Sequence, residues 1–184
     1  FTFGHMLSKL QVNLQASDTY SGIEYIKVTT LSIENMPASA STKASFTQTS
    51  PTAPAGVYTP ASYTSALSII GTSGTSTSGL YILKGGSLSG DVVTAPTAQN
   101  QSFNYYVAPN TPAGAGTDKY LLNIGYTIKY VDGITEDVAI TDVDLSEKLA
   151  SLLQNNSYTL TIKVGLNQIF FTVDEIKGWV DQSA

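Results

Sequence analysis

The sequence predicts an all-β protein, an antiparallel β-sandwich of two sheets and Greek-key type, with one short helix near residues 145–153. Three observations favour this fold class. Hydrophobic and polar residues alternate with a period of two over several segments, as in strands that bury one face. Turn dipeptides separate consecutive segments, so neighbouring strands can pair as antiparallel hairpins. The helical stretches that a parallel α/β sheet needs between its strands are missing from the pattern.

The first predicted strand runs from Phe1 to Leu14, and its apolar side changes along the way. Apolar residues occupy one parity up to Leu7 and the opposite parity from Leu10 onward. Either a β-bulge lies near Ser8 and Lys9, or both faces of this strand are covered. Because chain ends are usually polar, the apolar start leads us to expect the downstream part of a longer polypeptide, cut near a domain boundary.

The clearest strand covers residues 120–130, and its apolar parity should line the core: Tyr120, Leu122, Ile124, Tyr126, Ile128 and Tyr130. Asp132-Gly133 follows, the preferred dipeptide of a type I′ hairpin turn, so residues 134–143 should return as the partner strand. A turn at Gly165-Leu166-Asn167 predicts a second hairpin, formed by residues 158–164 and 169–173. Further strands are expected at residues 22–31 and 101–108, with a weaker one at 80–84.

Residues 144–153 predict the one helix. Asp144 and Glu147 are spaced as in a capping box, in which side chains satisfy the free amide groups of the first turn. An apolar stripe at helical spacing then follows, formed by Leu145, Leu149, Leu152 and Leu153. We expect a short helix that connects two strands and ends at Asn155-Asn156.

The chain length suits a single domain over residues 1–184. Within it, residues 36–79 are rich in Ser, Thr, Gly and Pro and predict a long loop region, and residues 108–117 predict a second loop. The chain contains no cysteine, so we expect neither disulfide bonds nor thiolate metal sites. No apolar run is long enough to cross a bilayer.

The composition indicates an uncharged, hydroxyl-rich surface, which is commoner on secreted and cell-surface β-proteins than on cytosolic enzymes. Charged residues make up 12% of the chain, about half of the globular average of about 25%. The net charge is −5, and the nine basic residues are all lysines, scattered along the chain. Because phosphate contacts need clustered Lys and Arg, the sequence argues against a nucleic-acid partner.

No pattern for catalysis is present, and we predict that the protein is not an enzyme and uses no cofactor. His5 is the only histidine; without a nucleophile-elbow motif we expect it to be structural rather than part of a catalytic triad. Asp142 and Asp144 have the spacing of two calcium ligands, but the rest of a calcium loop is missing, so we predict no metal site. The acids of residues 132–144 should face solvent rather than line a glycosidase cleft.

Tyrosine is abundant, with eleven residues against six Phe and one Trp. Tyr105 and Tyr106 are neighbours in a predicted strand, so one ring must face outward. They are the candidate glycan contacts, although tyrosine is also a common strand residue. Trp179 is expected to pack on the sandwich near the chain end.

Two segments carry a family resemblance. The first is Phe1-Thr-Phe-Gly-His-Met-Leu-Ser-Lys-Leu-Gln-Val-Asn-Leu14, and the second runs from Tyr158-Thr-Leu-Thr-Ile162 through residues 169–173 to Ile176-Lys-Gly-Trp179. They resemble the opening strand and the closing strands of the C-terminal domain in the fimbrillin-like proteins of Bacteroidales, the type V pilus subunits and their relatives. These motifs are structural, and none is catalytic.

The resemblance implies a transthyretin-like sandwich in a two-domain lipoprotein, exported to the extracellular side of the outer membrane. It implies a structural or adhesive subunit of a surface fimbria, joined to other pilus subunits by β-strand exchange. Because the chain ends soon after Trp179, a tip or accessory position is favoured over the stalk. Phe1, Phe3 and His5 form the candidate strand-exchange or interdomain face.

The alternative function is a non-pilus, carbohydrate-binding surface lipoprotein. In either case a host or bacterial surface protein or glycan would be a further partner. Loss of glycan-array binding on replacement of Tyr105 or Tyr106 would favour the alternative.

Overall fold

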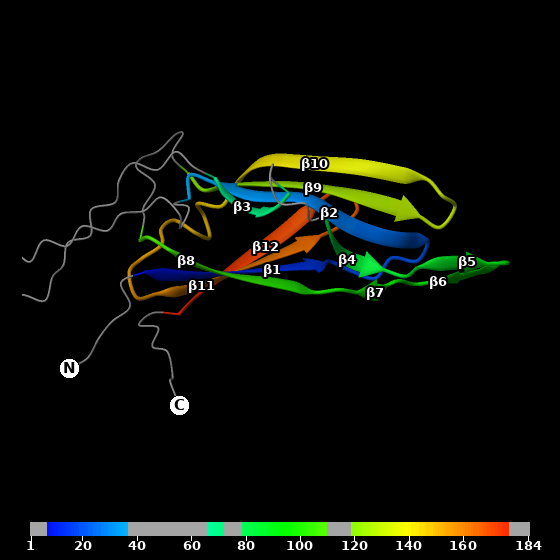
Figure 1. Ribbon diagram of the computed structural model, residues 1–184, viewed down its shortest axis with the longest axis horizontal. Helices are drawn as coiled ribbons and strands as arrows, with labels where there is room; N and C mark the ends of the chain where they lie inside the picture. The colour runs from blue at the N-terminus through cyan, green and yellow to red at the C-terminus, as the bar shows by residue number, and fades with distance from the viewer. Residues whose placement is uncertain (1–6, 37–65, 72–78, 110–118, 177–184) are drawn as a thin grey trace, which may run out of the picture.

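The computed structural model describes residues 7–36, 66–71, 79–109 and 119–176. Two β-sheets lie over one another as separate layers (Figure 1), and a continuous cluster of buried apolar side chains from both sheets forms the core. The predicted all-β sandwich is confirmed. In the described part of the chain, no helix is long and apolar enough to span a membrane.

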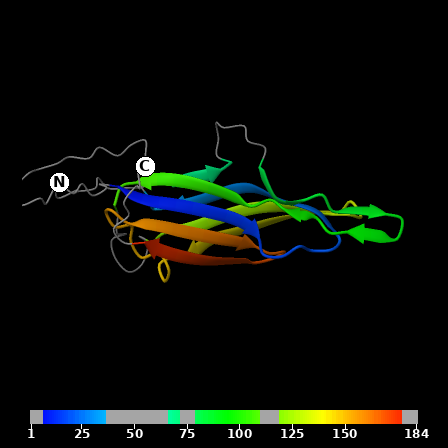
Figure 2. The same ribbon diagram turned by 90° about the horizontal axis from the view of Figure 1, so that it is seen from below.

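The first sheet has four strands in the order β12-β11-β1-β8 (Figure 2). These are β12 (Ile169–Ile176), β11 (Ser157–Val164), β1 (Ser8–Ala16) and β8 (Gln101–Val107). The central pair β1–β11 is parallel, which departs from the predicted antiparallel arrangement. Alternation marks the buried face of a strand but not its direction, and these two strands come from distant parts of the chain, so no hairpin forces them to be antiparallel.

The second sheet has the order β10-β9-β2-β4-β7, and β3 also pairs with β2. Its strands are β10 (Thr135–Asp144), β9 (Leu121–Tyr130), β2 (Ile23–Glu34), β3 (Leu67–Ile70), β4 (Leu80–Lys84) and β7 (Thr97–Ala98). Between β4 and β7, β5 (Ser87–Ser89) and β6 (Val92–Thr94) form a two-stranded ribbon. Figures 1 and 2 show this ribbon projecting beyond the sandwich.

The predicted core face of residues 120–130 is confirmed. Its side chains from Tyr120 to Ile128 are buried, whereas Tyr130 is half-buried and donates its hydroxyl proton to Glu136 Oε2 (3.0 Å). In β1 the buried parity runs through Leu10, Val12 and Leu14. The predicted change of parity falls where the described residues begin, so the half of that strand before Leu7 lies outside them.

The predicted helix near residues 145–153 is wrong. The N–H groups of Lys148 (3.0 Å) and Leu149 (2.7 Å) donate to the Leu145 carbonyl oxygen, which closes a single turn, and no further helical turn follows. Leu145, Leu149 and Leu152 are buried in the core cluster, whereas Leu153 is exposed. A single helical turn fixes several backbone dihedral angles but gains few hydrogen bonds. The burial of three leucines therefore decides the local conformation.

The turn after β9 differs from the predicted type I′ geometry. A four-residue loop, 131–134, joins the strands, with hydrogen bonds from Tyr130 N–H to Ile134 O (2.9 Å) and from Gly133 N–H to Tyr130 O (3.0 Å). Gly133 has a positive φ of 92° but Asp132 does not, whereas a type I′ turn needs both. The predicted turn after β11 is confirmed, because Gly165 N–H donates to Gln168 O (2.7 Å).

Candidate functional site

The two candidate glycan contacts lie on opposite faces of β8. Tyr106 is 49% exposed, while Tyr105 is half-buried and packs against the core. Burial raises the pKa of the Tyr105 hydroxyl above its ordinary value. The prediction that one ring of the pair faces outward is therefore confirmed, and the two rings cannot form one shared platform.

Phe1, Phe3 and His5 lie outside the described residues, as does Trp179. The first described residue, Leu7, is exposed, and so is Leu153 in a segment that is hydrogen-bonded to the start of β1. Hydrogen bonds hold the two segments together, from Ser8 Oγ to Leu153 O (2.5 Å) and from Asn155 N–H to Leu7 O (3.3 Å). An exposed apolar pair therefore marks the end of the sandwich where the predicted interdomain segment enters.

Strand β12 forms one edge of the four-stranded sheet. Its eight residues pair with β11 along an unbroken register, from Ser157↔Ile176 to Val164↔Ile169. On its outward face Phe170 is 51% exposed, and residues 169–173 contain no charged side chain. Natural edge strands usually resist further pairing through lysine, proline or a bulge, and this stretch of β12 has none of them.

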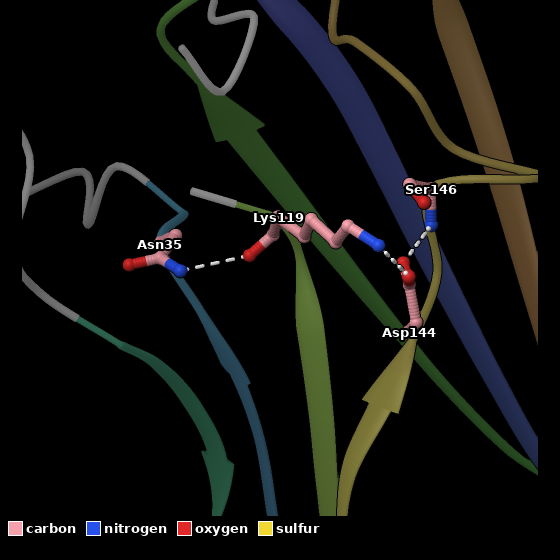
Figure 3. A network of polar contacts seen from close by, with 4 residues as sticks. All are labelled: Asn35, Lys119, Asp144 and Ser146. Atoms are coloured by element: carbon pink, nitrogen blue, oxygen red, sulfur yellow. Dashed lines mark hydrogen bonds and ion pairs between the residues drawn. The ribbon is translucent and has the colours of Figure 1, made fainter. Parts of the chain in front are cut away.

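A polar network ties three strands together at one end of the six-stranded sheet (Figure 3). Asn35 Nδ2, just after β2, donates to the carbonyl oxygen of Lys119 (2.8 Å). The Lys119 ammonium pairs with Asp144 Oδ2 at the end of β10 (2.5 Å), and Asp144 Oδ1 accepts the Ser146 N–H (2.8 Å). The hydrogen bonds from Lys119 and then from Ser146 lower the pKa of Asp144 to about 2. The carboxylate therefore stays ionised and acts as a clamp on the turn that follows.

Among the residues that the structure describes, no group of three or more His, Cys, Asp or Glu side chains could hold a metal ion. Asp142 and Asp144, the two acids with calcium-ligand spacing, take part in the local backbone structure. Asp144 forms the clamp above, and Asp142 has a φ of 58° where the β9–β10 register shifts. The Asp142 N–H donates to Asn123 Oδ1 (2.8 Å), so the bulge is itself hydrogen-bonded.

A surface of tyrosines and lysines on the six-stranded sheet was not anticipated from the sequence. It consists of Tyr25 and Lys27 on β2, Tyr81 and Lys84 on β4, and Lys129 on β9, and we call it the Tyr–Lys face. A hollow of about 400 Å³ lies against it, at the base of the projecting β5–β6 ribbon. These tyrosines and lysines stand at the outward positions of predicted strands, so the sequence contained the residues of this surface. Only the pairing of β9, β2 and β4 brings them side by side.

The sequence matches the family model of fimbrillin-like proteins over residues 1–179. The chain belongs to the fimbrillin-like family. The resemblance predicted from the two terminal segments is thus confirmed. A search among curated proteins gives no match.

Among solved structures, this fimbrillin-like chain is similar to a fimbrial protein from Bacteroides vulgatus, with 20% identity and a TM-score of 0.46 over 96% of this chain and 55% of the other. It is also similar to the tip fimbrial protein Mfa3 from Porphyromonas gingivalis with C-terminal truncation. There the identity is 9% and the TM-score 0.38, over 95% of this chain and 52% of the other. The chain spans about half the length of these proteins.

Proposed function

We propose that this fimbrillin-like chain is the C-terminal sandwich domain of a structural or adhesive subunit of a bacterial surface fimbria. It acts through assembly rather than catalysis, at a tip or accessory position. Membership of the fimbrillin-like family supports the fimbrial role, and with it a place on the extracellular side of the outer membrane.

The observation that carries the proposal is the edge of β12. Residues 169–173 of β12 have main-chain groups on the side away from β11. No charged side chain or bulge in this stretch opposes pairing with another strand. An added strand would gain a row of main-chain hydrogen bonds, while its alternate side chains would pack beside Phe170 and its neighbours. A strand from another pilus subunit fits this edge.

The end of the sandwich near Leu7 is the proposed interdomain face. Leu7 and Leu153 expose apolar surface there, and the preceding segment continues with Phe1, Phe3 and His5. Exposed apolar patches mark interaction sites in soluble proteins, so this segment and the leucine pair would pack together against an upstream domain.

Hydrogen exchange on the isolated chain and on assembled fimbriae tests strand addition directly. We expect the amide groups of residues 169–175 to exchange more slowly in the fibre, and Phe170→Lys to prevent incorporation, since an edge lysine opposes pairing. Ile134→Lys is the matched control, because Ile134 is as exposed but lies in the β9–β10 loop. Unchanged exchange in β12 together with normal incorporation of the Phe170→Lys protein would refute addition at this edge.

A second candidate function, a carbohydrate-binding surface lipoprotein outside any pilus, is supported by the outward ring of Tyr106. Because Tyr105 packs against the core, Tyr106 alone could serve as the glycan contact on β8. Glycan-array binding that is lost with Tyr106→Leu, in cells whose fimbriae assemble normally without the protein, would favour this candidate.

A further inference from the structure

The Tyr–Lys face alternates aromatic and cationic side chains across three neighbouring strands. Tyr25 on β2 lies in register between Lys129 on β9 and Lys84 on β4. One row further along, Lys27 on β2 lies beside Tyr81 on β4. Strands β9, β2 and β4 are consecutive neighbours in the sheet, and the contacts between these side chains place them on one face of it.

The two rings and the lysines contact one another. The rings of Tyr25 and Tyr81 are 5.2 Å apart and nearly perpendicular, with an interplanar angle of 86°. The Lys84 ammonium lies 4.6 Å and the Lys27 ammonium 5.6 Å from the Tyr81 ring centroid. The Lys129 ammonium lies 5.9 Å from the Tyr25 ring centroid. These contacts are in the range of cation–π interactions, and they hold the side chains in place before any ligand arrives.

A hollow of about 400 Å³ lies where this face meets the projecting ribbon, within the range of about 300–1,000 Å³ found for small-molecule sites. Its side-chain lining is mixed, with the apolar Leu88 and Val131 beside the polar and aromatic Glu24, Tyr25, Tyr81, Lys84 and Ser87. The corner of the ribbon is fixed, because Gly85 N–H (3.0 Å) and Gly86 N–H (3.1 Å) both donate to Glu24 O. A Cβ on Gly86 would lie 1.7 Å from Ile23 O, so only glycine fits this corner.

The charges of the hollow favour an anion. The one carboxylate in its lining, Glu24, pairs with Lys129 (2.9 Å). In the described part of the chain the ammonium groups of Lys27 and Lys84 contact an aromatic ring rather than a carboxylate. Lys84, which lines the hollow, therefore keeps its positive charge uncompensated there, and Lys27 adds a second such charge on the adjoining Tyr–Lys face, on a protein whose net charge is −5.

We propose that this hollow binds an acidic saccharide, a pyranose that carries a carboxylate. The Lys84 ammonium pairs with the carboxylate. Because the rings of Tyr25 and Tyr81 are nearly perpendicular, one ring covers the apolar C–H face of the sugar and the other contacts the edge of the sugar. The Tyr and Ser87 hydroxyl groups offer hydrogen bonds to sugar hydroxyls. A site of this size takes one or two rings, which favours a sugar unit over a long acidic peptide. Binding of the saccharide at this hollow requires neither fibre assembly nor strand addition at β12.

The test is calorimetric or NMR titration of the whole chain with tri-galacturonic acid and, as a matched neutral ligand, its fully methyl-esterified form. We expect saturable binding of the acid and weaker binding of the ester. Lys84→Gln should weaken binding about twofold to fivefold, the range for an exposed ion pair. Tyr81→Leu should weaken it by about fivefold or more, because an aromatic face contributes contact area as well as stacking.

The control makes the lysine change on the other sheet. Lys163 is an exposed strand lysine in the four-stranded sheet, so Lys163→Gln should leave the affinity unchanged. Thermal unfolding of each variant checks that the fold is retained, and Lys84→Gln at an exposed position should retain it. Absence of saturable binding, equal binding of the ester, or an equal loss with Lys163→Gln would overturn the proposal. Equally tight binding of poly-glutamate with the same dependence on Lys84 would also overturn it, in favour of an acidic peptide.

Discussion

The two sheets end in edge strands that are protected to very different degrees. Strand β10 closes one side of the six-stranded sheet with a register shift between Ile140 and Val143, an Asp142 φ of 58°, and four acidic side chains between residues 136 and 144. Strand β12 closes the four-stranded sheet with an unbroken register and an uncharged stretch at residues 169–173. Bulges and charges deter edge-to-edge pairing, so β10 is protected against it, whereas residues 169–173 of β12 are not.

Both edges are nevertheless anchored in a similar way. Each pairs with a neighbour whose inward side chains are buried in the core, and each presents a glutamate to a tyrosine of that neighbour. Tyr130 on β9 donates to Glu136 on β10, and Tyr158 on β11 donates to Glu175 on β12. The difference between β10 and β12 therefore lies in the bulge and the charges along their unpaired sides, and not in their attachment to the core.

The prediction with the largest expected effect tests whether β10 and β12 are attached equally strongly to their neighbours β9 and β11. Ile124 on β9 and Ile162 on β11 are both buried, and each faces a residue of its edge strand, Ile140 and Phe171 respectively. Ile124→Ala and Ile162→Ala should each lower the free energy of unfolding by about 2–5 kcal/mol, as for other large-to-small core changes. Urea denaturation measures both. A negligible cost at either site would show that its strand is not anchored by that face.

The second prediction separates the two tyrosines. The buried Tyr158 hydroxyl accepts the Leu153 N–H (3.0 Å) and donates to Glu175 Oε1 (3.1 Å), so Tyr158→Phe leaves a backbone donor without its partner. The expected loss of stability is about 1–3 kcal/mol. Tyr130 is half-buried, water can replace its hydroxyl, and Tyr130→Phe should stay within about 0.5 kcal/mol. The reverse order, measured by denaturation, would contradict the comparison.

The third prediction concerns pH and the end of β10. The contacts with Lys119 and Ser146 lower the pKa of Asp144 from 3.8 to about 2. A carboxylate with a lowered pKa in the folded state stabilises the protein fully above its unfolded pKa, and this contribution is lost as the pH falls toward the folded pKa. The unfolding midpoint of the native chain should therefore fall more steeply between pH 3.8 and about 2 than that of Asp144→Asn. Parallel curves for the two proteins would show that the clamp does not contribute.

The smallest effect is expected on the outer faces next to each edge. Thr127 Oγ1 on β9 donates to Asp137 Oδ1 on β10 (2.6 Å), but this pair is exposed to water. Thr127→Ala should change stability by no more than about 0.5 kcal/mol, and so should Thr161→Ala at the half-buried outer position of β11. If Thr127→Ala costs as much as Ile124→Ala in the same denaturation series, the assignment of inner and outer faces is wrong.

The sequence by itself determined where most strands lie and which face each one buries. Residues 80–84 were predicted as a strand and form β4, and Leu122, Ile124 and Ile128 are buried as the alternation requires. A period of two is a local property of an extended chain, and it needs no knowledge of neighbouring strands. The two terminal motifs likewise identified the family, because each motif is defined by residues close together in the sequence.

The tertiary structure alone decided what depends on contacts between distant segments. The parallel β1–β11 pair and the turn that replaces the helix near Leu149 both follow from packing against strands remote in sequence. The Tyr–Lys face needs Lys129, Tyr25 and Lys84 from three strands in one register. Strand order and register are set by the shared burial of many residues, which local alternation does not encode.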